Sequence, residues 1–263
     1  MIVLHPALPF APWADPRTRR LPGVMPLDMD DWLRVDAAYV GQMGLRDALI
    51  AGREHEVHAV LPQAVAAADE LLAQVLPYLP GLGFAAVPGG WRRPDAVVVA
   101  DSPQPLLTLG RLLQNDFCLM QDDGAGEHAL TGAILCFPAG WTLAEKLGRP
   151  LMRVHRPVAP YSEDVGRRVQ RLMDAIRPET PMWRMNANYS QAPLFNPQPE
   201  AQDRTVRRTD HPFIRSERQC LIRLPATRAV VFSIHTYLVR REDLTPDQAA
   251  ALEAFPLHDP GAV

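Results

Sequence analysis

The chain has 263 residues and a formal net charge of −3 at pH 7, and 47% of its residues are hydrophobic. This composition is typical of a globular protein and excludes a disordered, collagen-like or coiled-coil chain. The slight excess of acidic residues argues against bulk nucleic-acid binding. The length is sufficient for one compact unit with a substantial core.

Two further features limit the class of protein. No run approaches the roughly 18 apolar residues of a membrane span, and prolines interrupt the N-terminal segment before a signal peptide could form. We therefore expect a cytoplasmic protein with no membrane partner. The cysteines Cys118, Cys136 and Cys220 are widely spaced, so a four-thiolate set within one chain is excluded and an internal iron–sulfur cluster is not expected.

The first third of the sequence predicts an arm followed by helices. Residues 1–27 are rich in proline and lack periodicity, which indicates an extended arm with Phe10 and Trp13 as apolar anchors. Apolar residues at helical spacing predict a helix from Asp30 to about Gly52. A second predicted helix covers about residues 62–79 and ends at a proline–glycine turn.

From about residue 105 the pattern changes to that of β-strands. Strand periodicity covers residues 106–108, 116–120, 130–137, 183–189, 219–224 and 229–239, with helices predicted at 143–147 and 163–176. This order predicts an α+β fold with a five-stranded antiparallel sheet and flanking helices. The expected organisation is an arm and helical extension (1–104), a core (105–240) and a C-terminal tail (241–263).

One histidine stands out by its sequence context. His155 lies directly before Arg156-Pro157, and a second proline follows at position 160. The two prolines stiffen the backbone and fix the direction of the imidazole, as an axial metal ligand requires. The alternative is a core histidine that hydrogen-bonds to the backbone. His55 and His58, at helical i, i+3 spacing, are more typical of a solvated helix end.

A second group of polar residues occupies two predicted strands. Arg215, Glu217, Arg218, Gln219 and Arg223 lead into one strand, and Arg184, Asn186 and Asn188 alternate along the strand before it. Strand periodicity predicts that these side chains share one face of the sheet. Such a face either meets solvent or lines a pocket for an anionic or strongly polarised ligand.

Several segments together resemble a known family. They include residues 136–141 (CFPAGW), 145–150 (EKLGRP), 154–158 (VHRPV), 217–219 (ERQ) and 232–237 (FSIHTY). In their order and spacing they are similar to the haem-dependent oxidative N-demethylase α-subunit family, over about residues 28–240. The chain departs from the pattern of that family at Asn115, Ala187, His235 and residues 159–160 (Ala-Pro), and a departure that lined the pocket would change the amine specificity.

The resemblance implies a PAS-type fold that binds haem b. His155 matches the histidine expected to be the proximal iron ligand, with His235 and His211 as the next candidates. The cationic and polar side chains that would bind the haem are Arg149, Arg153, Arg156, Arg184 and Asn186. Glu217, Arg218 and Arg223 would form the catalytic group, in which a carboxylate holds the substrate ammonium and a guanidinium polarises O2.

The resemblance also implies a reaction. The subunit would use O2, and electrons from a partner reductase with flavin and an iron–sulfur cluster, to dealkylate a small secondary or tertiary amine such as dimethylamine. Two alternatives remain from the sequence. One is a haem-PAS gas sensor or haem-binding module without turnover, and the other is a binding protein that keeps the fold without haem.

Overall fold

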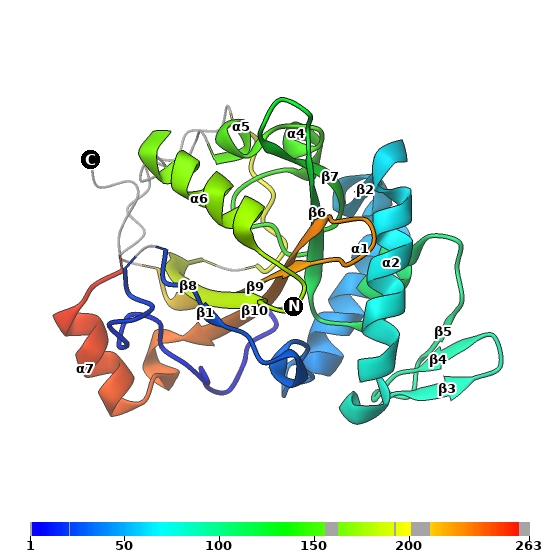
Figure 1. The fold of residues 1–263 in the computed structure, drawn as a ribbon. Helices are drawn as coiled ribbons and strands as arrows, with labels where there is room; N and C mark the ends of the chain where they lie inside the picture. Colours follow the sequence, from blue (N-terminus) through cyan, green and yellow to red (C-terminus); the bar gives the residue numbers. More distant parts are fainter. Residues whose placement is uncertain (1, 21, 156–162, 192, 201–210, 258–263) are drawn as a thin grey trace.

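A seven-stranded antiparallel sheet forms the centre of the protein, in the order β1-β8-β9-β10-β6-β7-β2 (Figure 1). The computed structural model describes residues 2–20, 22–155, 163–191, 193–200 and 211–257, with the backbone alone for His155 and residues 163–165. The strands are β1 (Met25–Pro26), β2 (His58–Val60), β6 (Asp116–Asp122), β7 (His128–Ile134), β8 (Met182–Ser190), β9 (Phe213–Arg223) and β10 (Val230–Arg240).

The sequence predicted five strands in this sheet, and the structure has seven. The five central strands, β6 to β10, coincide with predicted strands, and the hairpin between β9 and β10 turns where expected. The two additional strands lie at the edges, where β1 pairs with β8 and β2 pairs with β7. They have two and three residues, too few for a detectable period-two pattern.

Seven α-helices are described. They are α1 (Tyr39–Val57), α2 (Val65–Val75), α3 (Pro105–Leu112), α4 (Leu143–Lys146), α5 (Leu151–His155), α6 (Glu163–Ala175) and α7 (Pro246–Ala254). The first predicted helix starts later than expected, because residues 29–31 form a separate 3₁₀ turn. The backbone N–H of Ala38 donates to Asp36 Oδ1 just before α1.

The predicted strand at residues 106–108 is wrong, since these residues lie in α3. Its apolar residues are nearly all buried, and a continuous apolar run does not distinguish a buried strand from a buried helix. Pro105 at the start of α3 favours the helix. The helix packs closely on the sheet at Gly110, where a Cβ atom would lie 2.5 Å from Cγ1 of Ile134.

A three-stranded sheet joins α2 to α3 and was not predicted. Its strands are β3 (Ala85–Val87), β4 (Gly90–Arg92) and β5 (Val98–Ala100). The buried Arg93 anchors this sheet to α1, because its guanidinium donates to Asp47 at 2.9 Å and to Asp95 at 2.6 Å. Its Nη1 also donates to the carbonyl of Arg111 in α3.

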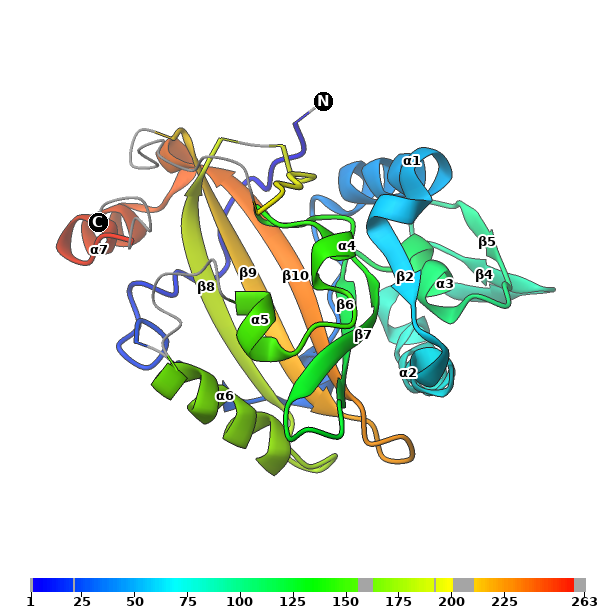
Figure 2. The ribbon, with the colours of Figure 1, turned by 90° about the horizontal axis from the view of Figure 1, so that it is seen from above.

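The central sheet has two differently covered faces. Helices α4, α5 and α6 lie on one side of β8, β9 and β10, which we call the helix face (Figures 1 and 2). On it Leu221 packs in one cluster with Leu151 of α5 and Met173 of α6. The opposite side, which we call the arm face, is covered near β8 and β10 by the N-terminal arm and α7.

Aromatic residues of the N-terminal segment pack against the central sheet. Trp13 is buried in a cluster with Met185 and Tyr189. Phe10 makes a T-shaped contact with Trp183, with the ring centroids 5.7 Å apart. None of the described helices combines the length and apolar character that crossing a membrane requires.

Candidate functional site

Three neighbouring strands bring polar side chains together on the helix face. Asn186 of β8 pairs with Glu217 of β9, and Glu217 pairs with Thr236 of β10. Directly paired residues of antiparallel strands project from the same face of the sheet. The adjacent rows are Arg184–Gln219–Ile234 and Asn188–Arg215–Leu238.

Glu217 is the centre of this polar face. Its Oε1 accepts a hydrogen bond from Nε of Arg215 at 3.0 Å. Its Oε2 accepts from Gln219 at 3.0 Å and from Asn186 at 3.2 Å. Asn186 also accepts the backbone N–H of Glu217 at 3.1 Å. The carboxylate is therefore fixed in direction, and Oε1 retains capacity for one further donor.

Arg215 ties this carboxylate to the segments beside the sheet. Besides the ion pair with Glu217, its Nη1 donates to the carbonyl of Leu194 at 3.0 Å, and its Nη2 donates to the carbonyl of Phe137. The side chain is 6% exposed. Because these donors already have partners, Arg215 acts as a fixed positive charge beside Glu217.

Two buried polar atoms on this face have no hydrogen-bond partner among the described residues: Nε of Arg184 and Oγ1 of Thr236. Burial lowers the pKa of Arg184, and the charge of Glu217 acts in the opposite direction. Such atoms cost free energy unless a ligand satisfies them. They belong to β8 and β10, which lie on either side of β9.

The residues expected to surround the cofactor are only partly described. His155 is the last residue of α5, and its side chain and the whole of Arg156 lie outside the described residues. Arg149 is exposed in the turn before α5. Arg153 of α5 donates from Nη1 to Glu200 at 2.9 Å. Of the predicted cofactor residues whose side chains are described, Arg184 and Asn186 lie together on the helix face.

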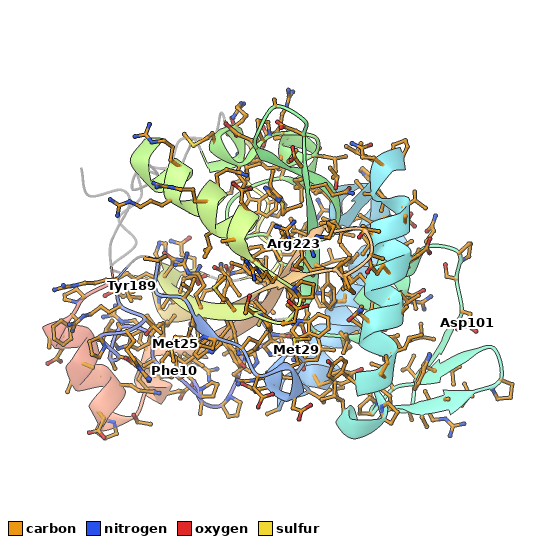
Figure 3. All side chains as sticks on the ribbon, in the orientation of Figure 1. Phe10, Met25, Met29, Asp101, Tyr189 and Arg223 are labelled. Atoms are coloured by element: carbon orange, nitrogen blue, oxygen red, sulfur yellow. The ribbon has the colours of Figure 1, made fainter. Side chains whose placement is uncertain are left out.

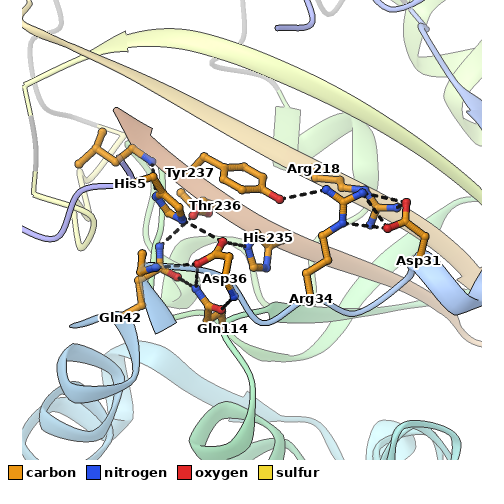
Figure 4. Close-up of polar contacts among 12 residues, drawn as sticks. His5, Asp31, Arg34, Asp36, Gln42, Gln114, Arg218, His235, Thr236 and Tyr237 are labelled. Carbon is orange, nitrogen blue, oxygen red and sulfur yellow. Dashed lines mark hydrogen bonds and ion pairs between the residues drawn. The ribbon is translucent and has the colours of Figure 1, made fainter. Parts of the chain in front are cut away.

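The three predicted catalytic residues are separated in the structure. Arg218 does not share the face of Glu217, because adjacent residues of a strand point to opposite sides. On the arm face its Nη2 donates to Asp31 at 3.0 Å and its Nη1 to the carbonyl of Trp32 at 3.1 Å (Figure 4). These contacts fasten the 3₁₀ turn at residues 29–31 to the sheet.

Arg223 shares the face of Glu217 but lies at the far end of β9, beneath α6 (Figure 3). Its guanidinium donates to the carbonyls of Met173, Ile176 and Arg228. Arg223 therefore closes the C-terminal end of α6, whose last carbonyls have no partner within the helix.

The arm face carries the one group of described residues with the composition of a metal site, namely His5, Asp36 and His235. Oδ2 of Asp36 lies 3.0 Å from Nε2 of His5 and 2.8 Å from Nε2 of His235 (Figure 4). Nδ1 of His5 accepts the backbone N–H of Leu238, so its Nε2 carries the proton and donates to Asp36. This tautomer is a hydrogen-bond donor and not a metal ligand, and the cluster fastens the arm to β10.

The charges of this cluster follow from its contacts. Burial opposes ionisation of Asp36, but the hydrogen bonds from His235 and His5 hold its pKa well below the usual range. Burial lowers the pKa of His235, against the effect of Asp36. The cluster is therefore a carboxylate that accepts hydrogen bonds from two histidines.

Three of the four departures from the family pattern lie away from the polar face, and the fourth, at residues 159–160, lies outside the described residues. Asn115 donates to Ser233 at 3.0 Å, Ala187 packs beside the arm, and His235 contacts Asp36. The structure thus gives no reason to expect that they alter a ligand on the helix face. His211, the other candidate ligand, precedes β9, and neither of its buried ring nitrogens has a hydrogen-bond partner among the described residues.

The cysteines offer no reactive thiol. Cys118 and Cys220 project from opposite faces of the sheet, as their positions in β6 and β9 require. Burial raises the pKa of all three thiols, to about 12 for Cys136 and about 11 for Cys220. Each thiol therefore stays protonated near neutral pH.

Sequence reasoning overlooked Thr236 and the contacts of Arg215. A lone threonine in a β-rich segment carries no functional signal, and only the strand register places Thr236 beside Glu217. The alternation of Arg215, Glu217 and Gln219 along β9 was visible in the sequence, and it separates these residues from Arg218.

A protein-family model matches most of the chain. The model for "Haem-dependent oxidative N-demethylase, alpha subunit-like" matches residues 23–255, which include α1 to α7 and every strand of the central sheet.

Proposed function

Because the chain belongs to the haem-dependent oxidative N-demethylase, alpha subunit-like family, we propose that it is the haem-binding subunit of an oxidative N-demethylase. Its substrate would be a small secondary or tertiary amine such as dimethylamine. The observation that carries the proposal is the buried Nε of Arg184, on the face that α5 covers, which has no hydrogen-bond partner among the residues that the structure describes. The arrangement of β6 to β10, with α4 to α6 between β7 and β8, supports a PAS-type fold.

The residues of this face fit haem b in chemistry. Arg184 and Arg215 carry two positive charges against the single carboxylate of Glu217, and this net positive charge suits an anionic group such as a propionate. In the next row along the strands, Leu221, Phe232 and Cys118 belong to an apolar cluster that also includes Leu151 of α5, so an apolar surface borders the polar rows. Haem bound here would supply the iron chemistry that activates O2.

In this proposal His155 holds the iron and Arg184 holds a propionate. Glu217, fixed by Arg215, Asn186 and Gln219, binds the amine through the remaining acceptor capacity of Oε1 and orients its methyl group. Arg218 and Arg223 have structural roles, since their guanidinium groups hold the 3₁₀ turn and the end of α6. Electrons come from a partner subunit with flavin and an iron–sulfur cluster.

The first experiment is an absorption spectrum of the full chain produced with a haem precursor, before and after dithionite and CO. We expect a Soret band, with a ferrous–CO maximum typical of histidine ligation. His155→Ala should lose haem, whereas His211→Ala and His235→Ala should retain it. Absence of a Soret band, with no recovery on addition of hemin, would overturn the proposal.

Turnover is tested separately from binding. The haem-loaded chain, supplied with photoreduced flavin, O2 and dimethylamine, should release formaldehyde. Bound haem without formaldehyde, at any amine concentration, would instead favour a haem-binding module that performs no turnover.

A further inference from the structure

The only lysine of the chain is buried. Lys146 of α4 is 3% exposed at its side chain, and its Nζ lies 2.5 Å from Oε1 of Glu200. The hydrogen bond from Lys146 lowers the pKa of Glu200. A buried ammonium without an anionic partner would be unfavourable, so Lys146 holds the Glu200 carboxylate in one position.

The same carboxylate also binds the next helix. Nη1 of Arg153 in α5 donates to Oε1 of Glu200 at 2.9 Å. The backbone N–H of Glu200 is directed to both carboxylate oxygens of Glu145 in α4, at 3.2 and 3.3 Å. Glu200 therefore joins α4 to α5.

Helix α5 needs external contacts to keep its position. It has five residues, and a helix this short is not stable on its own in water. Leu151 is buried at its start, where an isolated bridge joins Ala129 to Pro150. Arg153 lies nearer to the end of α5, two residues before His155, so its ion pair restrains the half of the helix that carries His155.

Glu200 is in turn placed by the polar face. It ends a segment, residues 194–200, that begins with the buried Leu194, whose carbonyl accepts from Arg215. The carbonyl of Asn196 accepts the backbone N–H of Gly140 at 3.0 Å. The guanidinium of Arg53 stacks over Phe195, 4.5 Å from the ring centroid. This segment therefore connects the partner of Glu217 to α5.

We propose that Glu200, held by Lys146, is a positioning residue for His155. This inference rests on the proposed function of His155 as the iron ligand. Its carboxylate fixes α5 through Arg153 and so fixes the distance between the ligand-bearing backbone and the polar face. Arg153 then forms an ion pair with Glu200 and does not bind a propionate. The Arg153–Glu200 pair is partly exposed, with side chains 39% and 24% accessible, so its loss should change haem retention by about twofold to fivefold.

The test uses the full chain loaded with haem. Glu200→Gln should speed haem transfer to an acceptor protein by about twofold to fivefold and shift the ferric Soret band, whereas Lys146→Arg should stay near the wild type. Glu179→Gln, at an exposed position in the turn after α6, is the matched control. Wild-type transfer rates and spectra in Glu200→Gln would overturn the proposal.

A second variant separates positioning from folding. Lys146→Met combined with Glu200→Leu removes both charges, and so avoids a buried ion without its partner. If the apo protein is more stable in this double variant than in Glu200→Gln while haem transfer stays fast, Glu200 positions α5. If haem retention recovers together with stability, the positioning role is excluded.

A third measurement does not require haem. Amide hydrogen exchange in α5 of the apo chain should become faster in Glu200→Gln than in Glu179→Gln, and unchanged exchange would overturn the anchoring of α5. If α5 exchange responds but the wild type binds no haem, the anchor exists and it is the proposed function that fails.

Discussion

Arg46 and Asp116 form an ion pair inside the protein, with 2.7 Å between Nη1 and Oδ1. The two side chains are 0% and 1% exposed. Arg46 also donates to the carbonyl of Gly110, and Asp116 accepts the backbone N–H groups of Cys136 and Phe137. The pair thus joins α1, α3 and the segment after β7, which carries the carbonyl that binds Arg215.

Arg46→Met should destabilise the fold by about 3–5 kcal/mol, because the Asp116 carboxylate would remain buried without its cation. Urea denaturation followed by circular dichroism measures this change. Arg240→Met is the control, since Arg240 pairs with Glu242 and Asp243 at the surface and such pairs contribute about 0–1 kcal/mol. Equal losses in the two variants would contradict the central role of the buried pair.

Stability should fall as the solution is acidified below about pH 6.5. The pKa of His235 is lowered by burial in the folded state, so the unfolded chain takes up this proton at higher pH than the folded chain. On acidification, His235 then lowers the free energy of unfolding by up to about 1.4 kcal/mol per pH unit, until the pH reaches the pKa of His235 in the folded protein.

Urea titrations at pH 7.5 and 5.5 measure this dependence. His235→Asn should show a smaller loss of stability between the two values than the wild type does. His55→Asn is the control, because the side chain of His55 is 82% exposed. A pH dependence unchanged by His235→Asn would show that the buried histidine is not responsible.

Arg184→Met should weaken haem binding about tenfold, because the haem loses about one hydrogen bond from a charged donor. The apo protein should be as stable as the wild type or more so, since the substitution removes a buried, incompletely bonded charge. Hemin titration and thermal denaturation measure the two effects. Arg177→Met, at an exposed site, should change neither, and parallel losses of haem affinity and apo stability would disprove the ligand role of Arg184.

In Glu217→Gln, an amine concentration about tenfold higher should be needed for the same shift of the Soret band, because the amine loses an ionised acceptor. Haem should be retained, since in our proposal Glu217 holds the amine and not the cofactor. Titration with dimethylamine in both proteins measures the change, with Glu179→Gln as the exposed control. Identical titration curves would remove Glu217 from the amine site.

The sequence was most informative where the pattern was long and regular. The strands β6 to β10 and the helix α6 were predicted to within a few residues at most ends, because each has enough residues for its period to be recognised. The arm was predicted from its prolines and two aromatic anchors. By contrast, α3 was read as a strand, and the short strands β1 to β5 were missed, because their residues gain their conformation from neighbours far away in the chain.

For the candidate site, the sequence by itself determined the family and the residue types of the polar face, since both depend on identities and spacing along the chain. Only the tertiary structure decided which of these residues meet. It placed Arg215 beside Glu217, turned Arg218 to Asp31 on the arm face, and joined Glu200 to Lys146 and Arg153. The reason is physical: strand register and the docking of α4 and α5 depend on packing between distant segments, and local periodicity contains no information on that packing.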